Sequence, residues 1–213
     1  MITIILMKNI KTRQEIQNYI TKKFLSEGFN KIPVAEISSK VKISKKTIYK
    51  NYFNKEEIIS EFFKVILNDA YQQLVFLIQS NNRMVEKVER LAEIIKKYLH
   101  VFDDESFHNL KREFPSIWFE ILVARKRKFI PLLNLLINHS KKHRLIIEFP
   151  NELLIKYFSV SLGLLSGKKT LNKFSLSYDK TFNDLFEILL NGILTKKGKK
   201  LLAINKRINN ENN

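Results

Sequence analysis

Apolar residues recur at helical spacing along most of the 213-residue chain, and the strict alternation of a half-buried strand is scarce. The apolar positions fall at i, i+3, i+4 and i+7, the pattern of helices that bury one face. Only five glycines and four prolines interrupt it. The pattern therefore predicts an all-α protein.

The first quarter of the chain carries signals for three short helices. Residues 12–15 (TRQE) have the spacing of a capping box, so we expect a helix to start at Thr12 and to end at Gly28. Pro33 suits the first position of a second helix. Ser44 offers its hydroxyl as the cap of a third helix. The sequence thus predicts two short helices joined by a turn before residue 44.

The third helix separates an inward side from an outward side. At 100° per residue, Ile48 and Tyr52 fall on one side, whereas Lys46 and Lys50 fall on the other. A second capping box at residues 54–57 (NKEE) then opens a long fourth helix. The predicted buried stripe of this fourth helix contains Ile59, Phe62, Phe63, Ile66, Ala70, Leu74 and Leu77.

Two short helices joined by a three-residue turn, with cations on the outer side of the second, form a helix-turn-helix. Lysines at helical spacing repel each other, and this repulsion is relieved when phosphates bind. The sequence therefore predicts a DNA-binding surface on the third helix. Three basic residues nearer the start are equally open to phosphate contact and to solvation: Lys8, Lys11 and Arg13.

Charge is concentrated at the two ends of the chain. The total is +17, of which residues 1–55 carry +9 and residues 196–213 carry +5, leaving +3 for the 140 residues between. A basic amino-terminal quarter favours a polyanionic partner there. We divide the chain into a helix-turn-helix DNA-binding domain at 1–54, a helical ligand-binding and dimerisation domain at 55–197, and a basic, disordered tail at 198–213.

The helix-turn-helix resembles the DNA-binding domain of the tetracycline-repressor (TetR) family. The family's segment Ser-Lys-x-Thr-aliphatic-Tyr-x-x-aromatic-x-x-Lys-Glu is matched here by Ser44, Lys45, Thr47, Ile48, Tyr49, Tyr52, Lys55 and Glu56. The resemblance implies that the DNA major groove and its phosphates are contacted by Lys46, Thr47, Tyr49 and Lys50. Ser44 and Lys45 belong to the same predicted DNA-binding set. It also implies that Lys55 clamps the DNA backbone.

Two departures from the family pattern make structural predictions. Lys42 stands where the family usually has a glycine in the turn, so either a left-handed backbone there costs roughly 1 kcal/mol or the turn differs slightly. Tyr52 replaces a commoner Phe at the inward position, so its hydroxyl needs a hydrogen-bond partner or an edge to water.

The larger remainder predicts helices near 84–100, 103–113, 115–143, 150–167 and 178–195. Pro131 falls inside one of them and is expected to kink or split it. The last two apolar stripes are candidates for a four-helix interface with a second copy. Their residues are Phe158, Leu162, Leu165, Phe182, Leu185, Phe186, Leu189 and Ile193.

Some aromatic residues of the larger part are candidates for a ligand cavity, although aromatics in helical stripes more often form plain core. The candidates are Tyr98, Phe102, Trp118, Phe119 and Tyr157. His139 and His143 have a spacing that could bind a metal, but they stand among cations and without an acidic ligand. We therefore expect no metal and no cofactor.

Several function classes are excluded by the sequence. There is no cysteine, nucleophile elbow, phosphate-binding glycine loop or HExxH motif, so we expect no enzyme. The apolar opening MITIIL is too short for a signal peptide, and no later run reaches the roughly 20 apolar residues of a membrane span. We expect a cytoplasmic protein without a membrane partner, starting at Met1 or Met7.

The predicted function is sequence-specific regulation of transcription by an all-α homodimer. We expect a repressor that binds a palindromic operator in double-stranded DNA and is released by a small-molecule effector, as the family resemblance implies. The alternative is a DNA-binding protein of the same fold without an effector, controlled by abundance or a protein partner. A further alternative is a general polyanion or membrane-surface binder that uses its basic ends.

Overall fold

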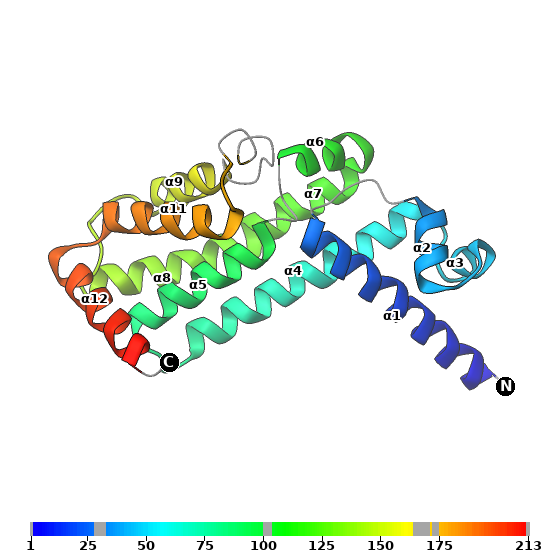
Figure 1. Ribbon diagram of the computed structural model, residues 1–213, viewed down its shortest axis with the longest axis horizontal. Helices are drawn as coiled ribbons and strands as arrows, with labels where there is room; N and C mark the ends of the chain where they lie inside the picture. Colours follow the sequence, from blue (N-terminus) through cyan, green and yellow to red (C-terminus); the bar gives the residue numbers. More distant parts are fainter. Residues whose placement is uncertain (1, 28–32, 100–103, 164–170, 172–174, 212–213) are drawn as a thin grey trace. The chain divides into compact units, whose positions relative to one another are not determined.

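The computed structural model describes residues 2–27, 33–99, 104–163, 171 and 175–211. These residues form helices and short connections, with one isolated bridge between Ile146 and Leu194, so the all-α prediction is confirmed. Contacts divide the chain into two compact units, whose helices are labelled in Figure 1. Unit 1 comprises Met1–Asp69 and His100–Ile121, and unit 2 comprises Ala70–Leu99 and Leu122–Asn213.

Unit 1 contains the helix-turn-helix and the helices that pack against it. Its elements are α1 (Ile2–Glu27), α2 (Val34–Val41), α3 (Lys45–Asn51), the first part of α4 (Lys55–Gln79), α6 (Asp104–Glu113) and most of α7 (Pro115–Ala124). The edge of the Phe24 ring meets Phe62, with centroids 4.9 Å apart. The predicted stripes are confirmed as buried faces, because this core includes Ile16, Ile20, Phe24, Ile37, Ile48, Ile59, Phe62, Phe63 and Ile66.

The first helix begins earlier than the sequence predicts. α1 starts at Ile2, so Thr12 lies inside a helix and is buried instead of capping one. No glycine or proline precedes Thr12, and a formed helix gains one hydrogen bond for each residue added, so nothing stops it from extending back. The helix ends at Glu27, as predicted, and Gly28 lies outside the described residues.

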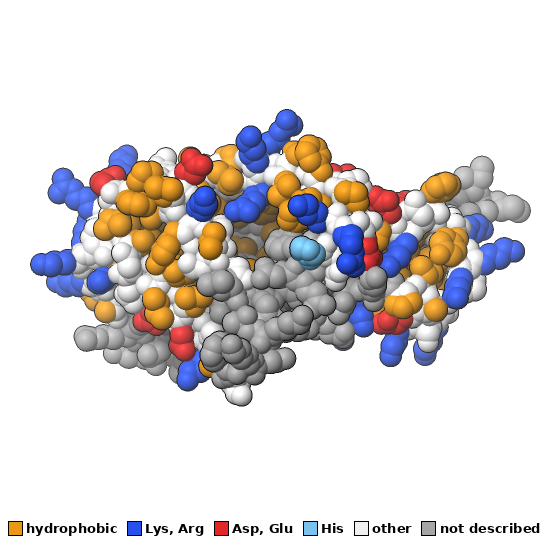
Figure 2. Space-filling model, turned by 90° about the horizontal axis from the view of Figure 1, so that it is seen from above, with side chains coloured by type: hydrophobic (Ala, Val, Ile, Leu, Met, Phe, Trp, Pro, Cys, Tyr) orange, Lys and Arg blue, Asp and Glu red, His pale blue; other side chains and the backbone are white. Residues whose placement is uncertain are grey.

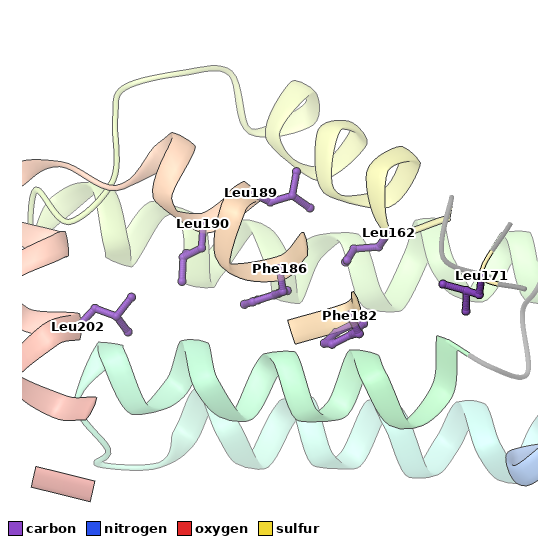
Figure 3. Packing of buried hydrophobic residues seen from close by; sticks show 7 residues of the cluster. All are labelled: Leu162, Leu171, Phe182, Phe186, Leu189, Leu190 and Leu202. Atoms are coloured by element: carbon purple, nitrogen blue, oxygen red, sulfur yellow. The ribbon is translucent and has the colours of Figure 1, made fainter. Parts of the chain in front are cut away.

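Unit 2 is a bundle built around two apolar clusters. Its elements are the rest of α4, α5 (Met84–Leu99), a π-helical turn (Arg125–Phe129), α8 (Ile130–Lys142), α9 (Asn151–Gly163), α11 (Tyr178–Ile193) and α12 (Lys196–Glu211). One cluster joins Leu74 and Leu77 of α4 to Leu136 of α8. The other, drawn in Figure 3, consists of Leu162, Leu171, Phe182, Phe186, Leu189, Leu190 and Leu202.

Pro131 interrupts a long helical stretch, as the sequence predicts. The π-helical turn at 125–129 lies directly before it, and the N–H of Ile130 donates to the carbonyl of Arg125. Proline has no N–H to donate and its ring displaces the carbonyl of the preceding turn, so the α-helical ladder cannot pass through it unchanged. α7 and α8 are therefore two helices joined by a wider turn.

The carboxyl-terminal stretch is helical, which corrects the prediction of a disordered tail at 198–213. α12 runs through it to Glu211, and its Leu202 and Asn205 are buried. The Asn205 amide accepts from Arg83 at 2.7 Å and donates to Glu89 at 2.9 Å. Composition suggested disorder because it does not show that α12 finds an apolar cluster and two polar partners in unit 2.

The start of α12 is joined closely to the segment after α8. The N–H of Thr195 donates to the carbonyl of Leu145, and that of Ile147 donates to the carbonyl of Ile193. A Cβ at Gly198 would lie 2.2 Å from the Leu145 carbonyl oxygen, so only glycine fits there. In the described residues, no helix is long and apolar enough to cross a membrane.

Candidate nucleic-acid interface

The turn between α2 and α3 is closed by a left-handed residue. Lys42 has φ 58° and ψ 42°, and its N–H donates to the Ser38 carbonyl oxygen. The Ser38 hydroxyl donates to the carbonyl of Ile43 at 2.6 Å, and the Ile43 N–H donates to the Ser38 carbonyl oxygen at 3.0 Å. The left-handed backbone at Lys42 is therefore present, at a cost that glycine would not incur.

The third helix is short, capped and two-sided. The Thr47 N–H donates to the Ser44 hydroxyl at 3.0 Å, which confirms the predicted cap. Ile48 and Tyr52 are buried, so the inward side is the predicted one. The outward side leaves Ser44, Lys45, Lys46, Tyr49 and Lys50 exposed and Thr47 half-buried.

The cations of this outward side are not paired with any carboxylate that the structure describes. Lys45, Lys46 and Lys50 form no ion pair with any residue that the structure describes. A lysine without a carboxylate partner keeps its full charge available for another anion. Because the backbone under these side chains is capped and packed, the surface can meet a rigid ligand without reorganising.

The joint between α3 and α4 is fixed by two capping hydrogen bonds. The N–H of Glu57 donates to the Asn54 side-chain oxygen at 2.8 Å, and the Glu57 carboxylate accepts from the N–H of Phe53 at 2.7 Å. The predicted capping box is present, although the carboxylate reaches one residue further back than expected. The Phe53 N–H, aided by Arg13, lowers the pKa of Glu57.

Arg13 is held inside unit 1. Its guanidinium lies 4.3 Å from the centroid of the Tyr52 ring and donates to Glu57 and Glu61, each at 2.7 Å. Gln17 donates to the Tyr52 hydroxyl at 3.0 Å, which supplies the partner that this hydroxyl needs. Of the three basic residues near the start, Arg13 is thus engaged with the protein, Lys11 is exposed, and the side chain of Lys8 lies outside the described residues.

Two further contacts within unit 1 involve α2 and the start of α4. Glu36 of α2 accepts from the Tyr19 hydroxyl and the Lys23 ammonium of α1, both at 2.8 Å, and the Lys23 and Tyr19 hydrogen bonds lower the pKa of Glu36. This ties α2 to α1. Lys55, expected to clamp the DNA backbone, is half-buried, with its ammonium 5.8 Å from the centroid of the Phe114 ring. Phe114, which lies between α6 and α7 in the same unit, is therefore a neighbour of the Lys55 ammonium.

The structure places the predicted dimer residues mostly in the interior of unit 2. Leu162, Phe182, Phe186 and Leu189 are buried in one of its clusters within the protomer (Figure 3). The reason is that the strongest apolar stripe of each helix faces the interior of its own protomer. Phe158, Leu185 and Ile193 are partly buried against the same cluster, and Leu165 lies outside the described residues.

A second apolar face of α9 and α11 stays exposed. Leu153, Tyr157 and Val160 stand at i, i+4 and i+7 on α9 and are 48%, 42% and 60% exposed, and Ile188 on α11 is 65% exposed. Hydrophobic side chains gather over these helices in Figure 2. The i, i+4, i+7 spacing of this weaker stripe was visible in the sequence and was overlooked beside the stronger one.

The predicted ligand residues are divided between the two units. Tyr98 is buried in unit 2 and its hydroxyl accepts from Gln73 at 2.9 Å, whereas Tyr157 is exposed on α9. Trp118 is half-buried in α7 of unit 1, and Phe119 beside it is 66% exposed. Phe102 lies outside the described residues.

Unit 2 has an open cavity of about 340 Å³ between α4 and α5. None of the four predicted ligand residues that the structure describes lines it. Its apolar lining residues are Phe76, Leu77 and Ile94, and its charged lining residues are Arg90, Glu93 and Lys97. The volume is at the lower end of the range typical of small-molecule sites. The other lining residues are Gln73, Ser80 and Asn82.

His139 and His143 stack on each other, with ring centroids 4.6 Å apart. Burial lowers the pKa of His139, and the charges of His143, Lys87 and Lys142 lower it further. In the part of the chain that the structure describes, no group of three or more metal-ligating side chains exists.

Comparison with known proteins gives a fold. No protein-family model matches the sequence, and no curated protein matches it. The chain is similar in structure to a transcriptional regulator from Saccharomonospora viridis in complex with choline. The TM-score is 0.72 and the identity 16%, over 87% of this chain and 99% of that one.

Two TetR-family transcriptional regulators are also similar. The one from Agrobacterium tumefaciens has a TM-score of 0.66 and 12% identity, over 88% of this chain and all of that one. The one from Marinobacter aquaeolei VT8 has a TM-score of 0.66 and 16% identity, over 92% of this chain and 97% of that one. At such identities structural similarity establishes the fold, and the chain has the fold of TetR-family transcriptional regulators.

Proposed function

We propose that this chain is a sequence-specific DNA-binding regulator of transcription. The observation that carries the proposal is the outward side of α3, where exposed cations that pair with none of the described carboxylates stand on a capped and packed helix-turn-helix. The fold shared with TetR-family regulators supports it. We assign DNA binding to residues 1–54 and regulation and dimerisation to residues 55–197.

The side chains of α3 suit two kinds of DNA contact. Lys46 and Lys50 reach phosphates or the acceptor edge of guanine, and Tyr49 and Thr47 offer hydroxyls to base edges or phosphates. Lys45 and Ser44 lie at the amino-terminal end of α3, where helix N–H groups attract phosphate. Lys55 contacts the DNA backbone if its ammonium moves away from Phe114.

The regulator acts as a homodimer. One short helix covers only a few base pairs, whereas two helices related by a two-fold axis match half-sites about 34 Å apart, one turn of DNA. The exposed apolar face of Leu153, Tyr157, Val160 and Ile188 supports contact between two copies, because such a face would otherwise remain in water. The operator is expected to be palindromic.

Release by a small molecule completes the proposed repressor. An effector changes DNA binding only if it binds more tightly to a form of the dimer whose reading helices do not match one turn of DNA. The cavity between α4 and α5 is lined by apolar side chains together with two cations and one carboxylate, which suits an amphipathic organic anion. Without such an effector, the same protein would be controlled by abundance or by a protein partner.

Selection of bound sequences from random duplex DNA tests the proposed function. The full chain should enrich a palindrome with half-sites one helical turn apart. Competition at several salt concentrations should show an affinity ratio between the enriched and scrambled duplexes that persists as salt rises. Binding that depends on salt and shows no sequence ratio would overturn the proposal and favour a general polyanion binder.

A further inference from the structure

Phe53 projects an apolar ring from residues 44–54, whose exposed side chains form the surface proposed to contact DNA, the reading surface. The residue is 90% exposed and directly follows Tyr52, which is 1% exposed. Tyr52 has an extended backbone, with φ −130° and ψ 130°, and successive side chains of an extended segment point to opposite sides. Since Tyr52 points into the core of unit 1, Phe53 points away from it.

The backbone that carries this ring is held in place. The Phe53 N–H donates to the Glu57 carboxylate at 2.7 Å, and the same side chain accepts from Arg13 at 2.7 Å. The next residue, Asn54, caps α4. A ring on such a backbone has only its own two side-chain torsions to order on binding, so a contact made by it costs little conformational entropy.

The surroundings of Phe53 are polar and cationic. In residues 44–54, all of which the structure describes, the other exposed side chains are Ser44, Lys45, Lys46, Tyr49, Lys50 and Asn54. Each of them carries a polar or charged group, so Phe53 is the purely apolar exposed side chain of this stretch. Lone exposed apolar residues are ordinary on protein surfaces. Phe53 differs because it is fixed within a surface that suits DNA.

We propose that Phe53 is an apolar DNA contact of the reading surface. DNA offers two kinds of hydrocarbon there, the C5-methyl groups of thymine in the major groove and the carbons of deoxyribose along the backbone. This inference rests on the proposed function, since it assigns a further contact to the same site. In the sequence, Phe53 lies between the exposed Lys50 and the half-buried Lys55, so cations on either side anchor the phosphates that bring the hydrocarbon within reach of the ring.

Replacement of the ring tests the inference on the operator selected by the wild-type chain. Phe53→Ala should weaken operator affinity by about ten-fold, and Phe53→Leu should keep most of it. The salt dependence of binding should not change, because no charge is lost. The matched control is Phe149→Ala, which removes a 44% exposed phenylalanine from unit 2 and should bind as the wild type does.

Duplexes with deoxyuridine in place of single thymines distinguish the two hydrocarbons. If Phe53 contacts a methyl group, the wild type binds one such duplex less tightly than the operator, whereas the affinity of Phe53→Ala is the same for both. If it contacts deoxyribose, Phe53→Ala weakens binding to all these duplexes equally. Either result supports the inference.

Two outcomes overturn the inference while the proposed function stands. One is a Phe53→Ala variant that binds the selected operator as tightly as the wild type. The other is a Phe53→Ala variant that loses affinity together with thermal stability, which would show a structural role. A wild-type chain that selects no sequence overturns both the proposed function and the inference.

Discussion

The guanidinium of Arg13 lies 4.3 Å over the ring of Tyr52, which places a cation from α1 against the inward residue that ends α3. Gln17 of α1 also donates to the Tyr52 hydroxyl. The helix α3 is therefore held by polar contacts between Tyr52 and α1 as well as by its buried Ile48. A basic residue whose sequence context fitted phosphate contact instead holds the end of the helix that we propose to contact DNA.

Arg13→Met keeps an aliphatic stem and removes the charge. We expect the free energy of unfolding to fall by about 1 kcal/mol, since the ion pairs with Glu57 and Glu61 are about a third exposed and a cation–π contact adds a similar amount. Urea unfolding followed by circular dichroism measures this. Lys11→Met, an exposed neighbour, is the control, and equal stability of the two variants would contradict the assignment.

Lys42→Gly should stabilise the protein by about 1 kcal/mol relative to Lys42→Ala. The residue has φ 58°, a left-handed conformation that glycine adopts without the strain imposed by a Cβ atom. Thermal unfolding of the two variants gives the difference. An alanine variant as stable as the glycine variant would show that the turn relaxes away from the left-handed region.

Lys50→Ala should weaken operator binding in one of two distinguishable ways. If Lys50 reads a base edge, affinity falls by roughly 1 to 3 kcal/mol and the preference at one or two base pairs relaxes. If it contacts phosphate, affinity falls uniformly and the slope of log affinity against log salt decreases by about 1. Lys111→Ala, an exposed lysine of α6, is the control. Unchanged binding removes Lys50 from the interface.

Val160→Glu combined with Ile188→Lys should produce monomers. Both side chains are at least 60% exposed in the protomer, so the substitutions leave its core intact while placing charges in the proposed contact between copies. Gel filtration with light scattering measures the mass, and circular dichroism confirms folding. Leu135→Glu on α8 is the control, with 55% exposure. A dimer that survives the double substitution excludes this face.

Stability should decrease as the pH falls through about 6.5, and His139 should contribute to the decrease. Burial and the neighbouring positive charges lower the pKa of His139 below its ordinary 6.5. The unfolded chain then binds more protons than the folded one in this range, so the free energy of unfolding decreases as the pH is lowered. His139→Gln should show a smaller loss between pH 7.5 and 5.5 in urea unfolding. An identical loss would exclude His139 as its source.

The sequence by itself determined the features that depend on neighbours in the chain. The helical content, the Ser44 cap, the capping box at 54–57 and the inward positions of Ile48 and Tyr52 follow from 3.6-residue periodicity and from hydrogen bonds that span three or four residues. At Lys42 the sequence left two alternatives open, a left-handed backbone or a slightly different turn, and the structure has the left-handed backbone. Such interactions are present in any window of ten residues.

Only the tertiary structure decided which of several equivalent side chains faces a partner far along the chain. Arg13 and Lys11 look alike in the sequence, yet only Arg13 meets carboxylates 44 and 48 positions away. The same holds for α9 and α11, each with apolar residues on two faces, one of which is covered by the protomer's own core. It holds for α12, which is ordered by Leu202 and Asn205. The physical reason is that burial and ion pairing depend on how distant helices pack, which local periodicity does not specify.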